Sequence, residues 1–387
     1  MIEIILANAG YWFNLLIPIF IILYLVLTNK EYTWKEFFIH TFIVGIFISL
    51  TYAVFFSTTT DLIDTEYQNS KVQKFEKYEK WTELVHYTET YSCGTSKNPR
   101  TCTRNKTRRE YHPEYFMLST TNNETKYISS KQYYRAEREF SSKEVYLHRS
   151  NQVSYGDGNK FVSYPSKVIP IAMPHTFENV VAAAKDNVIH TRVSLKTIER
   201  LKKKNKLYDY PQSYEGYYGE TLLNRLMNNS SSIINSSLVN KLNQMSERAG
   251  KIKQANPIIY LTNEDRDFKD VLSQHWKMGK KNDVILVLGI KKGKIEWSDV
   301  ICFTNNTDFK VDMRNDFEGK AFDKNTLIHF EALIYRSYIR KPMKEFDYLK
   351  ENITLEWYWQ LAIFMMNLII NIFVTRYFLT NTERKWR

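Results

Sequence analysis

Three long apolar runs constrain this chain more than any other feature. They cover residues 12–27, 37–56 and 358–374, and His40 is the only acidic or basic side chain in them. A helix rising ~1.5 Å per residue crosses the ~30 Å hydrocarbon core of a membrane with roughly 17 to 25 such residues. We therefore predict two N-terminal transmembrane helices within residues 1–56 and a third at 357–375. Buried core helices are the alternative.

The first run could also be a cleaved signal sequence. Such a sequence begins with basic residues, whereas the segment before Trp12, "MIEIILANAGY", contains Glu3 and no lysine or arginine. A membrane span fits better.

Charges beside the runs predict their orientation. Lys30 and Lys35 lie between the first two runs, and the tail at 376–387 is basic. The other flanks are acidic, and positive flanks stay in the cytoplasm. We expect an integral protein of the inner (cytoplasmic) membrane, with its C-terminus in the cytoplasm and one large domain facing the outside or periplasm.

The region at 57–250 is predicted to be β-rich or mixed. Residues 81–93, "WTELVHYTETYSC", alternate as a strand does, after a helix or long strand at 65–80. Short alternating pieces at 111–170 indicate an irregular β unit. Helical patterns follow at 175–187 and 194–206.

Residues 251–350 are predicted to form an α/β sandwich. "PIIYLT" and "DVILVLGI" are apolar strands separated by the amphipathic "RDFKDVLSQHW", and "KIEWSDVICFT" and a helix at 326–339 follow. The predicted fold class is therefore α+β, with three transmembrane helices flanking an extracytoplasmic β-rich part and an α/β sandwich.

The sequence "GIKKGK" at 289–294 invites comparison with a phosphate-binding loop. That loop needs four residues between its first glycine and the glycine–lysine pair, and it must open a helix. Here three residues separate Gly289 from Gly293, Ile295 follows Lys294, and a strand comes next. We predict a hairpin turn. Other catalytic motifs are also missing from the sequence, which favours a non-catalytic role without excluding an enzyme.

Two of the three cysteines lie close together in a polar segment. Cys93 and Cys102 would form a local disulfide outside the membrane. Free thiols are one alternative. A zinc site with His86 and His112 is another, although eight intervening residues exceed the usual spacing. Cys302 lies in an apolar run and is predicted to be a packed core thiol.

Acidic residues suggest one candidate metal site. Asp308, Asp312 and Asp316 would share a helix face, and Asp265 follows the first strand of the sandwich. Together they could bind calcium or magnesium. The alternative is a solvated acidic face interleaved with basic residues, without any cofactor.

Basic clusters give the chain a formal net charge of +12. One is "LKKKNK" at 201–206, and the other contains Lys97, Arg100, Arg104, Lys106, Arg108 and Arg109. Outside a membrane they would attract anionic lipid or cell-wall polymers rather than nucleic acid. A solvated surface is the alternative.

Two resemblances add to these predictions. "HWKMGKKNDVILVLGIKKGKIEWSDV" resembles the TPM module, an extracytoplasmic α/β sandwich linked to divalent metal and sometimes to phosphatase activity, over about residues 250–350. That module usually continues with a glycine-rich stretch, where this chain has "CFTNNTDF". "ELVHYTETYSC", "YHPEY", "PHTFENVVAAAKD" and "RKPMKEFDYL" resemble an uncharacterised group of membrane proteins common in tailed phages.

These observations lead to one functional prediction and two alternatives. We expect a phage-encoded, non-catalytic binding or scaffold protein at the host cell envelope, with membrane lipid, a wall polymer or another envelope protein as partner, or as a homo-oligomer. The alternatives are a metal-dependent phosphohydrolase and a holin-like pore suggested by Asn367 and Asn371 in the third span.

Overall fold

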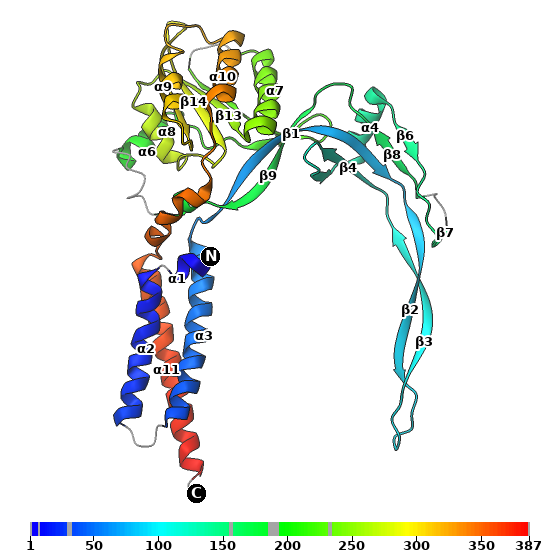
Figure 1. Ribbon diagram of the computed structural model, residues 1–387, viewed down its shortest axis with the longest axis vertical. Helices are drawn as coiled ribbons and strands as arrows, with labels where there is room; N and C mark the ends of the chain where they lie inside the picture. The colour runs from blue at the N-terminus through cyan, green and yellow to red at the C-terminus, as the bar shows by residue number, and fades with distance from the viewer. Residues whose placement is uncertain are drawn as a thin grey trace.

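The structure is a computed structural model that describes residues 2–6, 8–28, 33–154, 158–184, 193–230 and 234–385. It has three parts (Figure 1): a helical bundle, an α/β unit above the bundle, and a curved β arch that ends in a long two-stranded ribbon. The sequence "GDG" at 156–158 predicts a turn, and its first two residues lie outside the described residues.

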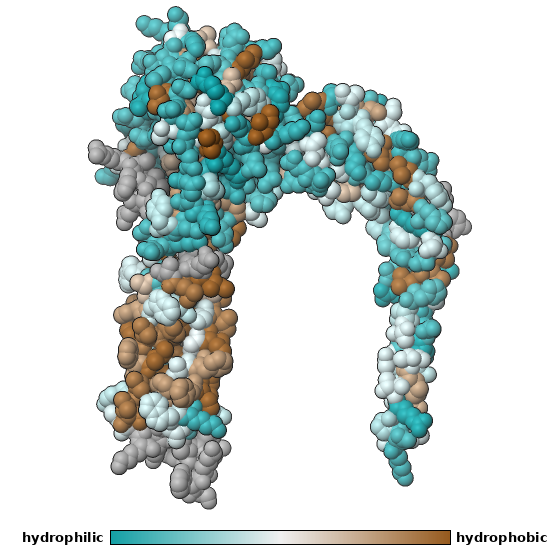
Figure 2. Space-filling model, in the orientation of Figure 1, coloured by the Kyte–Doolittle hydropathy of each residue, from teal (hydrophilic) through white to brown (hydrophobic). Residues whose placement is uncertain are grey.

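Three helices form the bundle: α2 (Ala9–Thr28), α3 (Trp34–Thr59) and α11 (Trp357–Lys385). Each is long and apolar enough to cross a membrane, with α11 qualifying over Trp357–Phe378. Figure 2 shows the apolar side chains on the outside of this bundle. The three apolar helices predicted from the sequence are confirmed. The short helix α1 (Ile2–Leu6) precedes them.

The bundle core is continuous with the part of the chain above it. Val44, Ile48 and Phe56 of α3 belong to the same buried cluster as Val181 and Ile353. Those two lie in or beside α5 (Val180–Ala183) and the 3-10 helix η1 (Met343–Asn352). Phe303, the residue after β15 (Lys294–Cys302) of the α/β unit, belongs to the same cluster, so apolar packing joins the bundle to that unit.

The amides that suggested a pore lie inside the bundle. Asn367 and Asn371 are 0% and 5% exposed, and Asn371 Nδ2 donates to the Asn367 carbonyl over 2.8 Å. Both face neighbouring helices of the same chain, as polar residues at helix–helix contacts do. Their placement does not favour a pore.

The α/β unit is built on a four-stranded sheet in the order β12-β13-β14-β15. The first three strands are parallel and β15 is antiparallel. Helices α7, α9 and α10 cover one face and α6 and α8 the other. The elements are α6 (Leu195–Lys203), β12 (Leu226–Asn229), α7 (Ser236–Lys253), β13 (Asn256–Thr262), α8 (Phe268–His275), β14 (Asp283–Lys291), β15 (Lys294–Cys302), α9 (Thr307–Asn315) and α10 (Lys324–Ser337).

The α/β unit begins earlier than the predicted boundary at residue 251. α6, β12 and most of α7 precede that boundary, yet Leu201, Leu226 and Leu242 are buried against the sheet. The polar residues around β12 concealed a short strand that pairs with β13.

The "GIKKGK" segment is the hairpin turn that the sequence predicts. Lys291 pairs with Lys294 at the end of β14 and β15. Lys292 and Gly293 have φ angles of 50° and 75°, the left-handed conformation that two-residue hairpin turns require. A strand follows the turn, so no helix N-terminus is available for a phosphate.

The arch is a sheet in the order β5-β4-β1-β8-β6, with β9 also paired to β1. The first half of β1 pairs with β9 and the second half with β4 and β8. Helix α4 packs on it through Tyr133 and Ala136. The elements are β1 (Ile63–Tyr78), β4 (Tyr115–Thr120), β5 (Thr125–Tyr127), α4 (Ser130–Phe140), β6 (Lys143–Val145), β8 (Lys160–Ser163) and β9 (Pro170–Glu178).

Two sequence predictions for this region are wrong. Helix α4 was not expected. The helix expected at 175–187 is instead the end of β9 followed by the short α5, and residues 185–187 lie outside the described residues. Pairing of β9 with β1 along nine residues outweighs the local helical pattern.

The ribbon consists of β2 (Trp81–Ser92) and β3 (Thr101–His112), with the short β7 (Gln152–Ser154) beside its base. β10 (Ser213–Glu215) and β11 (Thr221–Leu223) form a separate small hairpin. The ribbon descends from the arch to the level of the bundle (Figure 1), and its surface is mostly hydrophilic or neutral, with some apolar side chains (Figure 2).

Candidate functional site

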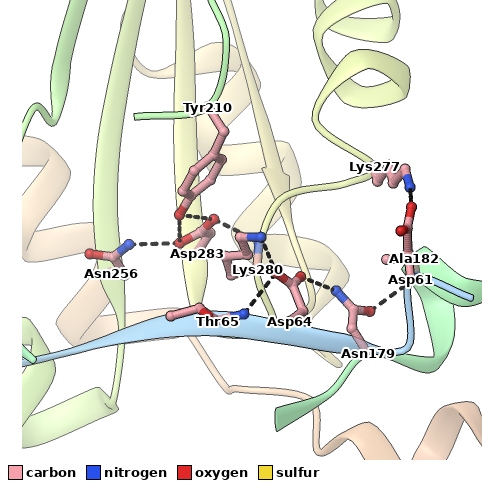
Figure 3. A network of polar contacts seen from close by, with 10 residues as sticks. All are labelled: Asp61, Asp64, Thr65, Asn179, Ala182, Tyr210, Asn256, Lys277, Lys280 and Asp283. Carbon is pink, nitrogen blue, oxygen red and sulfur yellow. Dashed lines mark hydrogen bonds and ion pairs between the residues drawn. The ribbon is translucent and has the colours of Figure 1, made fainter. Parts of the chain in front are cut away.

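A polar junction joins the arch, the C-terminal end of α3 and the α/β unit. β1 begins four residues after α3 ends. Asp61 lies in the turn between them, and Asp64 is the second residue of β1. Asp61 forms an ion pair with Lys277, and Asp64 forms one with Lys280 (Figure 3). Asn179 Nδ2 also donates to Asp64 over 2.8 Å. The start of β1 is therefore held by the segment between α8 and β14.

Asp283 is the buried centre of this junction. Its carboxylate accepts hydrogen bonds from Asn256 Nδ2 at 2.7 Å, the Tyr210 hydroxyl at 2.9 Å and the Lys280 backbone N–H at 2.7 Å (Figure 3). Burial disfavours the charged form and raises the pKa of Asp283 to about 6. Burial, together with the neighbouring carboxylate, also raises the pKa of Tyr210.

Arg225 extends the network into the root of the arch. It is 4% exposed and donates to the side-chain oxygens of Asn256 and Asn69. Burial lowers the pKa of Arg225 to about 10. A buried cation is stable only when its N–H donors have hydrogen-bond partners. Arg225 finds these partners in Asn69 of β1 and Asn256 of β13, and it therefore links the two strands.

A polar cavity of about 480 Å³ opens beside this network. Glu66, 1% exposed, lies in its wall with three basic groups around it. The separations are 3.2 Å to Arg340, 3.3 Å to Lys281 and 3.5 Å to His175. Arch and α/β unit both line the cavity, because Glu66 and His175 come from β1 and β9.

The ribbon is the second candidate site, because its residues are exposed or half-exposed. No residue of 81–112 is buried. One face carries aromatic and basic side chains in contact: Arg104 lies over the Tyr91 ring at 5.0 Å, and Arg149 over Trp81 at 4.0 Å. Trp81 also stacks on His112. The other face is rich in threonine.

Charge on the ribbon is unevenly neutralised. It contains six lysines and arginines against three glutamates. Arg104 and Lys106 each lie 2.6 Å from Glu89, and Arg108 pairs with Glu110. The cations without an acidic partner among the described residues are Lys97, Arg100 and Arg109.

The expected disulfide is present at the ribbon tip. Cys93 and Cys102 are bonded, with their Cα atoms 5.7 Å apart. His112 instead contacts Glu83 at 3.2 Å, so the zinc alternative does not hold. Cys302 is a buried free thiol, and burial raises its pKa to about 12.

The predicted metal residues are not brought together. Asp312 pairs with Arg336 at 2.7 Å, Asp316 contacts His329 at 3.1 Å, and Asp265 lies 3.5 Å from Lys291. Asp308 is in the first turn of α9 and exposed. Within the described ranges, the acidic and histidine groups that do converge are Glu83, Glu110 and His112 on the ribbon. The acidic face of α9 is salt-bridged surface.

Comparison with known proteins adds no relative. No protein-family model matches the chain, and neither a curated protein nor a solved structure matches it. The resemblances to TPM modules and to phage membrane proteins therefore stay predictions.

Sequence reasoning missed the junction, although a signal was present. The acidic stretch "TDLIDTE" at 60–66 follows the second span, and the basic "KMGKK" at 277–281 follows α8. Opposite charge at two such segments indicates that they pair. Asp283, Asn256 and Arg225 had no comparable signal.

Proposed function

We propose that this protein is a non-catalytic, membrane-anchored binding protein of the cell envelope. Its ribbon binds a phosphate-bearing polyanion outside the membrane, either an anionic lipid surface or a wall polymer. The observation that carries the proposal is the ribbon itself, a 32-residue hairpin that has no buried residue and carries three cations without an acidic partner in the described structure.

The physical argument for a binding role starts from stability. A two-stranded hairpin without a hydrophobic face is marginal in water. The disulfide at its tip and the cation–aromatic contacts on one face support the ribbon. A chain segment held in this way, projecting basic and aromatic groups, matches the chemistry that attracts phosphates.

The basic flanks of the three helices favour an orientation in which these flanks lie in the cytoplasm and the arch and the α/β unit lie outside. A disulfide agrees with an oxidising exterior compartment. A phage-encoded protein acting on its host envelope fits this arrangement.

The position of the ribbon in a bilayer follows from its charge. Figure 1 places it level with the bundle, where each cation would cost about 2.5 to 3.5 kcal/mol in hydrocarbon. We infer that the ribbon lies instead at the headgroup surface or above it. β1 has a register shift between Val72 and Lys74, where its partners change, and bending there would move the ribbon.

A charge-matched comparison tests the function. Full-length protein in phosphatidylcholine nanodiscs would be mixed with phosphatidylglycerol-containing vesicles or with soluble poly(glycerol phosphate). The test variant is Lys97→Gln/Arg100→Gln/Arg109→Gln. The control, Lys196→Gln/Lys203→Gln/Lys204→Gln, removes the same charge from three lysines in or beside α6, none of which has an acidic partner in the described structure.

The ribbon variant should bind roughly a hundredfold more weakly, since each cation near a phosphate surface contributes about 1 kcal/mol. The control should bind nearly as well as the natural chain. Binding to the vesicles alone would identify anionic lipid as the partner, and binding to the soluble polymer alone would identify a wall polymer. Equal losses in both variants, or no binding to either polyanion, would refute the proposal.

A further inference from the structure

We propose that the polar cavity at the root of the arch is a binding site for a small oxyanion, a phosphate or carboxylate group. The cavity is distinct from the ribbon and independent of the proposed function. Its volume of about 480 Å³ is large enough for such a ligand.

The charge of the lining favours an anion. Lys251, Lys281 and Arg340 line the cavity against a single carboxylate, Glu66. Lys281 and Arg340 are mostly buried, with side chains 17% and 22% exposed. Lys251 has no acidic partner among the described residues. The lining therefore holds more positive charge than Glu66 neutralises.

The geometry leaves donors available to a ligand. Contacts from Glu66 to Arg340 and Lys281 are 3.2 and 3.3 Å, longer than the ~2.7 to 2.9 Å of tight charge-assisted hydrogen bonds. A guanidinium has five N–H donors and an ammonium three. Arg340 uses donors on Glu66 and on Gln254, which leaves others for an oxyanion.

The amides around the cavity add neutral polar groups. Gln68, Asn122, Gln254 and Asn282 line it. Asn282 is 3% exposed. Its Nδ2 donates to the Tyr67 carbonyl over 2.8 Å, whereas its Oδ1 has no hydrogen-bond partner within the part of the chain that the structure describes. An unpaired buried oxygen is unfavourable, and a protonated or hydroxylated ligand, or an accompanying water, would satisfy it.

Occupancy would connect two parts of the protein. Glu66 and His175 belong to the arch, whereas Lys251, Lys281 and Arg340 belong to the α/β unit or its edge. An anion held by both sides would stabilise the arch root against the α/β unit.

The test uses the full chain in phosphatidylcholine nanodiscs, with inorganic phosphate and succinate as probes. Chloride at matched ionic strength is the control. Phosphate, succinate or both should bind by calorimetry and raise the melting temperature more than chloride does. An equal rise with chloride, or no heat of binding for either probe, would overturn the site.

Paired variants locate the binding. Lys251→Glu should weaken binding at least roughly tenfold, as expected for one lost charge-assisted contact, whereas Lys196→Glu should leave it unchanged. Glu66→Gln should tighten binding, because the internal competitor is removed, and added phosphate should restore its melting temperature. If Glu66→Gln does not fold, the comparison of Lys251→Glu with Lys196→Glu still shows whether the anion binds in this cavity.

The ribbon variant should retain anion binding at the cavity. If the ribbon variant binds vesicles weakly but still binds phosphate or succinate, the two sites are independent and the two proposals are tested separately. Identical affinities for Lys251→Glu and the natural chain would place the anion elsewhere and contradict this inference.

Discussion

Lys280, in the turn before β14, forms an ion pair with Asp64 of β1 across 216 positions of sequence. Both side chains are mostly buried, at 21% and 17% exposed. The second pair of the junction, Lys277 with Asp61, is far more exposed, at 48% and 74%. Two ion pairs, one mostly buried and one exposed, therefore connect the C-terminal end of α3 and the start of β1 to the α/β unit.

The two pairs should differ in energy. A double-mutant cycle with Asp64→Asn and Lys280→Gln should give a coupling energy of about 1 kcal/mol or more. The same cycle on Asp61 and Lys277 should give about 0 to 0.5 kcal/mol, because water screens exposed pairs. The measurement is chemical unfolding of the chain in detergent. Equal coupling in both cycles would mean that burial of the inner pair has no energetic consequence.

Asp283 should make stability depend on pH. Its folded pKa of about 6 lies above the unfolded value near 3.8, so the folded state binds the proton more tightly. The stabilisation that protonated Asp283 gives the folded state is therefore fully present below about pH 4. It is lost as pH rises to about 6, which lowers the unfolding free energy by about 3 kcal/mol. The difference in unfolding free energy between the natural chain and Asp283→Asn should shrink across that window. A difference that is constant from pH 4 to 7 would show that Asp283 titrates normally.

Close packing at Gly250 should be essential to the arch root. A Cβ there would lie 2.4 Å from the Asn69 carbonyl oxygen and 2.5 Å from its Cβ. Gly250→Ala should push α7 away from β1 and destabilise the protein by about 1 to 3 kcal/mol. Ser246→Ala, one turn earlier on α7, is the control, since it adds no atom and removes one bond to the Leu242 carbonyl. Comparable melting temperatures for Gly250→Ala and the natural chain would contradict the packing.

The disulfide should stabilise the ribbon alone. Replacing Cys93 and Cys102 by serine should expose the tip, at Lys97 and Arg100, to faster cleavage by trypsin. The melting temperature of the α/β unit should stay the same, because no ribbon residue is buried. The disulfide stabilises the closed ribbon tip by about 2 to 3 kcal/mol, and this local stabilisation is lost in the serine variant. A large fall in the global melting temperature would show that the ribbon tip contributes to the stability of the rest of the molecule.

Elements with strong local patterns could be predicted from the sequence. The three apolar helices, the strand at β2 and the β14–β15 hairpin each follow from hydrophobic runs, alternation or turn residues. β9 could not, because its strand conformation depends on pairing with β1, more than one hundred residues earlier. Local patterns contain no information about such a partner.

The candidate sites divide in the same way. Cys93, Cys102 and the basic ribbon were visible as a local cluster in the sequence. The junction was not, because Asp64, Asp283 and Arg225 are brought together only by the packing of the arch on the α/β unit. Asp312 and Asp316 pair with basic side chains of α10, and Asp308 is exposed, so neighbouring elements rather than a metal ion neutralise this acidic segment.

The central claim, a basic ribbon held outside the membrane, is tested most directly by thiol labelling of intact cells. A membrane-impermeant maleimide would be applied with and without prior reduction in a Cys302→Ser background, which leaves Cys93 and Cys102 as the only cysteines. We predict labelling of intact cells only after reduction. Labelling only after lysis, with no reductant needed, would place the ribbon in the cytoplasm and contradict the account.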